Sequence, residues 1–173
     1  MTVVRPAAVE DADELGVVHV RAWQAAYRDG LMPDEYLDSL SATDRAQMWR
    51  QAIESGDRPR SRRLVAEDDG GTIIGFVIVG PAEGDPASST GEVFAINVHP
   101  HHWGDGGGRM LLEAGVGGLQ EDGFVEAVLW VHPDNQKARR SYERNGWACD
   151  DLERTQEIFG VVVPEVRYRR SLG

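Results

Sequence analysis

The sequence predicts a single α/β domain with a mixed central sheet of about six or seven strands flanked by helices. Short apolar runs alternate with amphipathic segments along the chain, and a strand, a helix, a strand and a helix follow one another between residues 92 and 145. This order implies parallel pairing of the two strands. The 173 residues show neither an internal repeat nor a linker, so one domain over residues 1–173 is expected.

The first part of the chain is predicted to be helical after a short strand near residues 3–5. Asp11 stands three residues before Glu14, which is the spacing of a capping box, and a helix is expected over about 12–28. Two further helices, the second capped by Ser41, are expected over 33–40 and 41–56.

Strands dominate the remainder. Two apolar runs flank Asp68-Asp-Gly-Gly71, which is the pattern of a β-hairpin. Beyond the hairpin, strands are expected at residues 92–98, 125–131, 147–157 and 161–169, and helices at 107–121 and 135–145. The last two strands would complete the sheet as an antiparallel end.

Composition limits the partners that this chain is expected to bind. Its formal net charge of −11 would repel phosphate backbones, so we expect no nucleic-acid partner. No apolar run approaches the ~20 residues of a membrane-spanning helix, and we expect no secretory signal. A single cysteine, Cys149, excludes an internal disulfide framework. Together these features predict a cytoplasmic protein without a membrane partner.

The most informative segment joins a predicted strand to a predicted helix through a glycine-rich turn. It reads Val93-Phe-Ala-Ile-Asn-Val-His-Pro-His-His-Trp-Gly-Asp-Gly-Gly-Gly108. Glycines let the backbone approach a ligand closely, and the first amides of a following helix point at an anion. The turn is therefore predicted to hold a phosphate or pyrophosphate, the alternative being a loop that only turns the chain.

Two other phosphate-binding motifs fit this turn poorly. A P-loop needs a Lys-Ser/Thr pair after its glycines, and none follows here. The dinucleotide pattern G-x-G-x-x-G, counted from Gly104 and Gly106, would require glycine at the position of Arg109.

A second motif lies downstream and reads Asn135-x-x-Ala-x-x-x-Tyr-x-x-x-Gly-Trp147. Its spacing places Asn135 at a helix start and a glycine at the helix end. Together with Trp103-Gly-Asp-Gly-Gly-Gly108, it resembles the GNAT superfamily of N-acetyltransferases, whose central motif is a strand, then Q/R-x-x-G-x-G/A, then a helix. The resemblance extends over essentially the whole chain.

The resemblance implies a single GNAT-like domain that transfers an acetyl group from acetyl-coenzyme A to a primary amine of a small molecule or peptide. The amine would attack directly in a ternary complex, without a metal. Members of the family are often dimers, which leaves a homodimer open. The positions implied in donor binding are Ile96, Asn97, Val98, Trp103, Gly104, Asp105, Gly106, Gly107, Gly108, Arg109, Asn135, Lys137, Ala138, Arg140 and Tyr142.

Two positions depart from the family pattern. Trp103 stands where Gln or Arg is usual, and Asp105 where a basic or neutral polar residue is common. Both departures would weaken pyrophosphate binding, which favours the alternative of a non-catalytic acyl-coenzyme A binding module. Arg109, Lys137 and Arg140 would supply compensating positive charge.

The resemblance also implies roles in the reaction. The backbone from Ile96 to Val98 would pair with the pantetheine arm, and the Val98 amide would polarise the thioester carbonyl. Tyr142 would protonate the leaving sulfur, the alternative being a tyrosine that packs on the sheet with its hydroxyl at the surface. Glu92 is the first choice for the general base and His99 the second, unless Glu92 is a solvated carboxylate at a strand end.

Aromatic residues near the N-terminus suggest where the acceptor binds. Trp23 and Tyr27, together with Trp49, would form an aromatic wall around a cationic or aromatic amine. The alternative is that these three side chains belong to the hydrophobic core.

Four histidines raise the question of a metal: His99, His101, His102 and His132. A structural zinc site usually closes with four ligands at characteristic spacing, and no cysteine lies near them. We therefore expect no metal, and the histidines are expected to line the surface beside the donor entrance.

Overall fold

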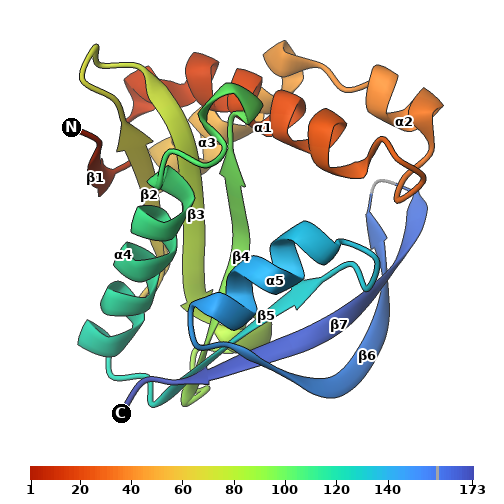
Figure 1. Cartoon of the computed structure of the whole chain (residues 1–173). Helices are drawn as coiled ribbons and strands as arrows, with labels where there is room; N and C mark the ends of the chain where they lie inside the picture. The colour runs from red at the N-terminus through yellow and green to blue at the C-terminus, as the bar shows by residue number, and fades with distance from the viewer. Residues whose placement is uncertain (159) are drawn as a thin grey trace.

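The computed structural model describes residues 1–158 and 160–173, whose strands form one mixed seven-stranded sheet (Figure 1). The strand order across it is β1-β2-β3-β4-β5-β7-β6. The strands are β1 Val3–Pro6, β2 Arg62–Glu67, β3 Ile73–Pro81, β4 Thr90–Val98, β5 Glu126–Val131, β6 Ala148–Ile158 and β7 Val161–Ser171. The predicted mixed α/β fold is confirmed.

The helices also follow the predicted order. They are α1 Ala12–Tyr27, α2 Asp34–Asp38, α3 Ala42–Glu54, α4 Gly107–Glu121 and α5 Gln136–Arg144, with 3-10 turns at Val9–Asp11, Ala82–Gly84 and Pro100–His102. Ser41 caps α3 as predicted, since its side chain accepts a hydrogen bond from the Asp44 amide at 3.2 Å. Among the described residues, no helix is long and apolar enough to cross a membrane.

The predicted capping box at the start of α1 is wrong. The Asp11 carboxylate accepts hydrogen bonds from the Arg5 guanidinium at 2.8 and 2.9 Å and from the Ala8 amide at 2.7 Å. Glu14 accepts from the Ile73 amide at 2.7 Å. The spacing of the two carboxylates fits a cap, but tertiary neighbours bind them instead.

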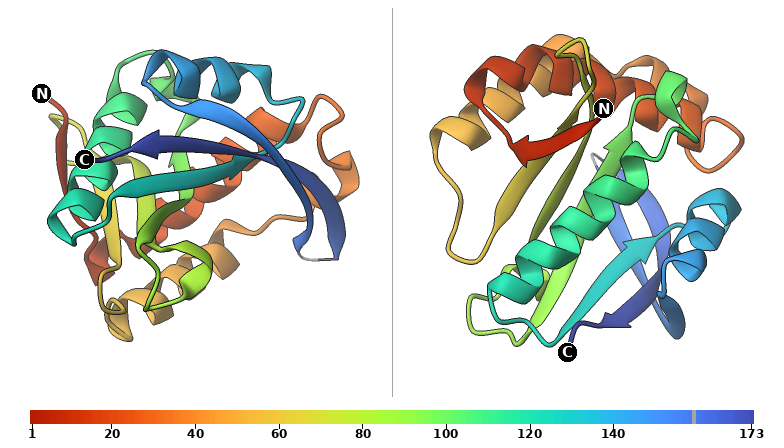
Figure 2. Two further views of the ribbon diagram at one scale, coloured as in Figure 1. Left: turned by 90° about the horizontal axis from the view of Figure 1, so that it is seen from below. Right: turned by 60° about the vertical axis from the view of Figure 1, so that its left-hand side comes forward.

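The two faces of the sheet are covered by different helices. Successive side chains of β3 point to opposite faces, so Phe76 packs in a cluster with Leu15 of α1 and Trp49 of α3, while Val77 packs in a cluster with Leu111 of α4. Figure 2 shows α4 lying along one face of the sheet and α1 and α3 on the other. The hydrophobic core therefore has two layers.

The parallel strands β4 and β5 are paired over a short stretch only. Thr90 to Val93 lie beside Glu126 to Leu129. Farther along, β4 remains paired with β3 as far as Val98, and β5 remains paired with β7 as far as Val131. The two strands thus separate toward their C-terminal ends and leave a split in the sheet, visible between β4 and β5 in Figure 1.

Helices α1 and α3 come into close contact at Gly16. A Cβ atom added there would lie 2.3 Å from the Ala42 carbonyl oxygen and 2.8 Å from the Ala46 amide nitrogen. Both are backbone atoms, so a side chain at this position would require one helix to move.

Replacing Gly16 with alanine is expected to lower the free energy of unfolding by roughly 1–3 kcal/mol, because the added methyl group forces the helices apart. The matched control is Gly117→Ala on α4, where an added Cβ meets nothing within 4 Å. The control should be neutral or stabilising by up to about 1 kcal/mol. Urea unfolding followed by circular dichroism measures both changes, and equal effects would contradict the close-contact explanation.

Candidate active site

The glycine turn leads from the C-terminal end of β4 into α4. Gly104 and Gly106 have φ angles of +89° and +90°, which favour glycine, and a Cβ atom at either would meet nothing within 4 Å. The Met110 amide makes the first helical hydrogen bond, to the Gly106 carbonyl at 3.0 Å. The amides of residues 107–109 precede it and point out of the helix N-terminus. The turn thus has the backbone geometry of an anion cradle.

The edge of β4 that faces the split carries backbone groups directed away from β3. The His99 amide donates to the Ile74 carbonyl at 2.8 Å, which fixes the register of this ladder. Backbone groups of an antiparallel strand alternate between its two edges, so those of Asn97 face β3 and those of Ile96 and Val98 face the split. An extended ligand in the split would meet them.

Trp103 and Lys137 make contact from opposite sides of the split. The Trp103 Nε1 donates to the Val98 carbonyl at 2.8 Å. The Nζ of Lys137, on α5, lies 3.7 Å from the centroid of the Trp103 indole ring. The other charged side chains of the predicted donor site, those of Asp105, Arg109 and Arg140, are exposed.

The second motif forms α5 as the sequence predicts. The Asn135 Oδ1 accepts from the Ala138 amide at 3.3 Å, which caps the helix, and Ala138 packs against the core. Gly146 follows the helix with a φ angle of +85°. These contacts set the orientation in which α5 presents Tyr142.

Tyr142 packs against the core with its ring centroid 6.4 Å from that of Trp147 and 6.1 Å from that of Tyr168. Burial raises the pKa of its hydroxyl, and the nearby Tyr27 raises that pKa further. The hydroxyl therefore stays protonated at neutral pH, which a proton donor requires.

Glu92 is 4% exposed, so the alternative of a solvated carboxylate at a strand end is excluded. Its Oε1 accepts a hydrogen bond from the Glu83 amide at 3.0 Å. Burial raises the pKa of the Glu92 carboxyl, the Glu83 hydrogen bond and Arg154 lower it, and the carboxylates of Glu83 and Glu165 raise it. Taken together, these effects leave the pKa of Glu92 above its ordinary value. A general base works best when its pKa is near the working pH, so the shift is in the favourable direction.

Sequence reasoning missed the groups around Glu92. Arg154 lies on β6 and Glu165 on β7, and the two form an ion pair at 2.9 Å. Arg154 also stacks on the Trp130 ring of β5, 4.1 Å from its centroid. A partial signal was available on the last predicted strand, where Glu165, Arg167 and Arg169 alternate with uncharged residues, but the register that joins the two strands is tertiary.

The predicted aromatic wall is only partly assembled. The rings of Trp23 and Tyr27 are 5.1 Å apart and pack on the cluster that contains Val163 of β7. Trp49 does not join them, because its ring packs edge-on against Phe76 at 4.7 Å within the core. Burial, helped by Glu165, raises the pKa of the Tyr27 hydroxyl to about 12.

The histidines beside the glycine turn form a small ring cluster. The His99 and His101 rings are 4.8 Å apart, and the His99 Nδ1 accepts from the His101 amide at 3.2 Å. Burial and then the neighbouring positive groups lower the pKa of His99. Over residues 1–158 and 160–173, no group of three or more His, Cys, Asp or Glu side chains is arranged to hold a metal.

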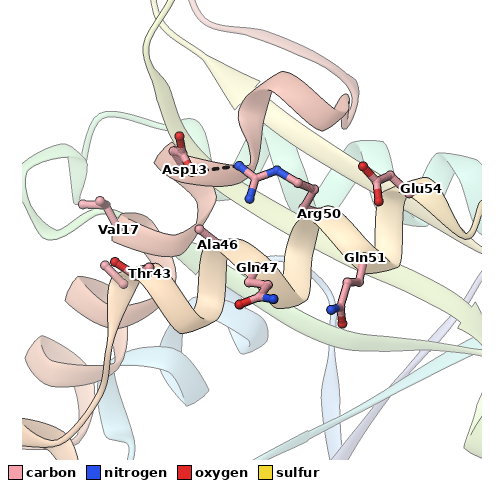
Figure 3. Close-up of a pocket in the computed structure, with 9 residues that line it drawn as sticks. Asp13, Val17, Thr43, Ala46, Gln47, Arg50, Gln51 and Glu54 are labelled. Carbon is pink, nitrogen blue, oxygen red and sulfur yellow. Dashed lines mark hydrogen bonds and ion pairs between the residues drawn. The ribbon is translucent and has the colours of Figure 1, made fainter.

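A surface groove elsewhere on the molecule contains none of the predicted site residues. It has a volume of about 660 Å³ and lies between α1 and α3 (Figure 3). Asp13 and Arg50 form an ion pair across it at 3.0 Å. The residues predicted to bind the donor lie instead on β4, on the glycine turn with the start of α4, and on α5 with the residue that caps it.

The sequence matches the family model described as the acetyltransferase (GNAT) family over residues 21–147, which is more than half of the chain. The chain belongs to this family. A Bacillus subtilis (strain 168) protein described as an uncharacterized N-acetyltransferase, YuaI, is 31% identical over 168 residues, which are 96% of this chain and 91% of that protein. Membership of the GNAT family places the chain among the acyltransferases.

Two further matches are more restricted. The mycothiol acetyltransferase of Kocuria rhizophila is 38% identical over 96 residues, which are 53% of this GNAT chain and 31% of that protein. The crystal structure of the PaiA N-acetyltransferase from Thermoplasma acidophilum in complex with coenzyme A has a TM-score of 0.75 at 20% identity and covers 99% of both chains. This second match shows that the fold is shared.

The raised pKa of Glu92 predicts a pH-dependent loss of stability. The folded chain holds this proton more tightly than the unfolded chain, so stability falls as the pH rises from the unfolded pKa, about 4.3, through the folded one. Glu92→Gln should therefore be more stable than the wild type at pH 8, with the difference vanishing near pH 4. Thermal unfolding at both pH values measures it.

The control for this prediction is Glu54→Gln at an exposed position of α3, which changes the net charge equally. Equal stabilisation by both variants would mean that the effect comes from net charge and not from the burial of Glu92.

Proposed function

We propose that the chain transfers an acetyl group from acetyl-coenzyme A to the primary amine of a small molecule or peptide, by direct attack in a ternary complex. The observation that carries the proposal is the glycine cradle at the N-terminus of α4, directly beside the free edge of β4. A ligand that joins a pyrophosphate to an extended amide-bearing arm fits both features. Coenzyme A has this construction, and it is the ligand of the Thermoplasma acidophilum structure.

The residues at the split match the needs of acyl transfer. Bound acetyl-coenzyme A supplies a thioester as the acyl donor. The free backbone groups of Ile96 and Val98 pair with the donor, and the Val98 amide stabilises the negative charge that develops on the carbonyl oxygen of the thioester. Tyr142 donates its hydroxyl proton to the departing sulfur as the C–S bond breaks. Glu92, acting through water, accepts the proton that the amine loses as the C–N bond forms.

We assign the acceptor to the side of the split where Trp23 and Tyr27 lie, because Tyr27 is close enough to Tyr142 to influence its pKa. Aromatic side chains suit a cationic or aromatic amine. Residues 1–173 are assigned to one N-acetyltransferase domain, which the single sheet supports. A cytoplasmic location is supported by the presence of a single cysteine.

Isothermal titration calorimetry with acetyl-coenzyme A tests the donor before the acceptor is known, with ATP and NADH as controls. Selective binding of acetyl-coenzyme A is the expected outcome, and it would justify screening amines by release of free thiol. Binding without turnover of any amine would favour a non-catalytic acyl-coenzyme A binding module. If acetyl-coenzyme A does not bind, the proposed function is wrong.

Replacing Tyr142 with phenylalanine should lower kcat by roughly 10²-fold or more, because the variant lacks the proton donor for the leaving sulfur. The affinity for coenzyme A should change little, since the ring and its packing remain. Steady-state kinetics at saturating donor, together with calorimetry, separate the two quantities. Unchanged turnover would exclude Tyr142 as the general acid.

A further inference from the structure

The side chain of Trp103 is fixed between the end of β4 and the start of α5. Its Nε1 donates to the Val98 carbonyl at 2.8 Å, which holds the indole at the C-terminal end of the free β4 edge. The face of the same ring lies against the ammonium group of Lys137. The indole therefore has two defined partners, one on each side of the split.

Lys137 is the single lysine of the sequence, in which every other basic side chain apart from histidine is arginine. Its Nζ, from the first turn of α5, lies 3.7 Å from the centroid of the Trp103 ring. The side chain is otherwise exposed, so an ammonium without this contact would sample many rotamers. A cation–π contact at an exposed site contributes about 0.5–1 kcal/mol, enough to favour one position.

The negative charge of Asp105 beside the anion cradle gives the position of the Lys137 ammonium a function. Asp105 places an exposed carboxylate within the glycine turn, 3.5 Å from the His102 Nδ1. A carboxylate there opposes the binding of a pyrophosphate. An ammonium held across the split from the turn offsets that effect and leaves the backbone amides of the cradle to make the hydrogen bonds.

We propose that Trp103 is a positioning residue that holds Lys137 across the open end of the split, where the ammonium group binds the phosphates of the acyl donor. The inference rests on the proposed use of a coenzyme A donor. It assigns a function to the tryptophan that replaces the usual Gln or Arg of the family motif.

The test compares two donors, acetyl-coenzyme A and S-acetylpantetheine, which ends before the pyrophosphate. Lys137→Met should weaken coenzyme A binding roughly 10-fold and raise KM for acetyl-coenzyme A without lowering kcat, because a charge-assisted contact is lost. KM for S-acetylpantetheine should not change. Lys137→Arg should restore most of the affinity, and Arg144→Met, at the other end of α5, should have no effect.

Two tryptophan variants separate the ring from its N–H group. Trp103→Phe keeps an aromatic face for Lys137 and should retain most of the affinity for coenzyme A. Trp103→Leu removes the face and should weaken binding about 3-fold, in the same direction as Lys137→Met. Should Trp103→Leu fail to fold, Trp103→Met, which also lacks the aromatic face, takes its place. Unchanged affinity for coenzyme A in the folded variant, with Lys137→Met impaired, would overturn the positioning function of Trp103.

The single lysine permits a direct readout in the wild type. An amine-reactive label followed by peptide mass spectrometry reports on Lys137 separately from the N-terminal amine. Coenzyme A should protect Lys137 from the label, and S-acetylpantetheine should not. This inference alone would be overturned if the wild type binds coenzyme A but the ligand does not protect Lys137 and Lys137→Met does not weaken binding. If the wild type does not bind coenzyme A, the proposed function is overturned.

Discussion

The separation of β4 from β5 is the constraint on which the rest of the site depends. Each strand is held along its outer edge, β4 by β3 and β5 by β7, while only the stretch ending at Val93 joins them to each other. Backbone groups without a partner inside a protein are costly, so the exposed edge of β4 needs occupants. The Trp103 indole N–H donates a hydrogen bond to the Val98 carbonyl. The other backbone amide and carbonyl groups of Ile96 and Val98 are available to pair with an extended ligand.

An anionic donor is compatible with the acidity of this chain because the cradle is built from the backbone. The net charge of −11 acts at long range and is screened within about 8–10 Å at physiological ionic strength. The amides at the start of α4 act at contact distance, and their direction is fixed by the helix and by glycines that leave the approach open. Local geometry therefore outweighs total charge at this site.

Burial acts on the two proposed catalytic groups in the same direction but with different consequences. It raises the pKa of Tyr142, which keeps the hydroxyl protonated and able to serve as an acid. It also raises the pKa of Glu92, which makes that carboxylate a stronger base once ionised. The same physical effect would thus suit Tyr142 to the proposed role of acid and Glu92 to that of base, with the protein interior supplying the low-dielectric surroundings.

The sequence by itself determined the features that depend on near neighbours along the chain. The order of elements, the glycine turn and the helical spacing around Tyr142 are of this kind, because turns, caps and amphipathic faces are set within a few residues. Only the tertiary structure decided that Arg5 binds Asp11, that Trp49 belongs to the core, that Glu92 is buried and that Lys137 meets Trp103. These outcomes depend on strand register and helix packing, which join residues far apart in the sequence.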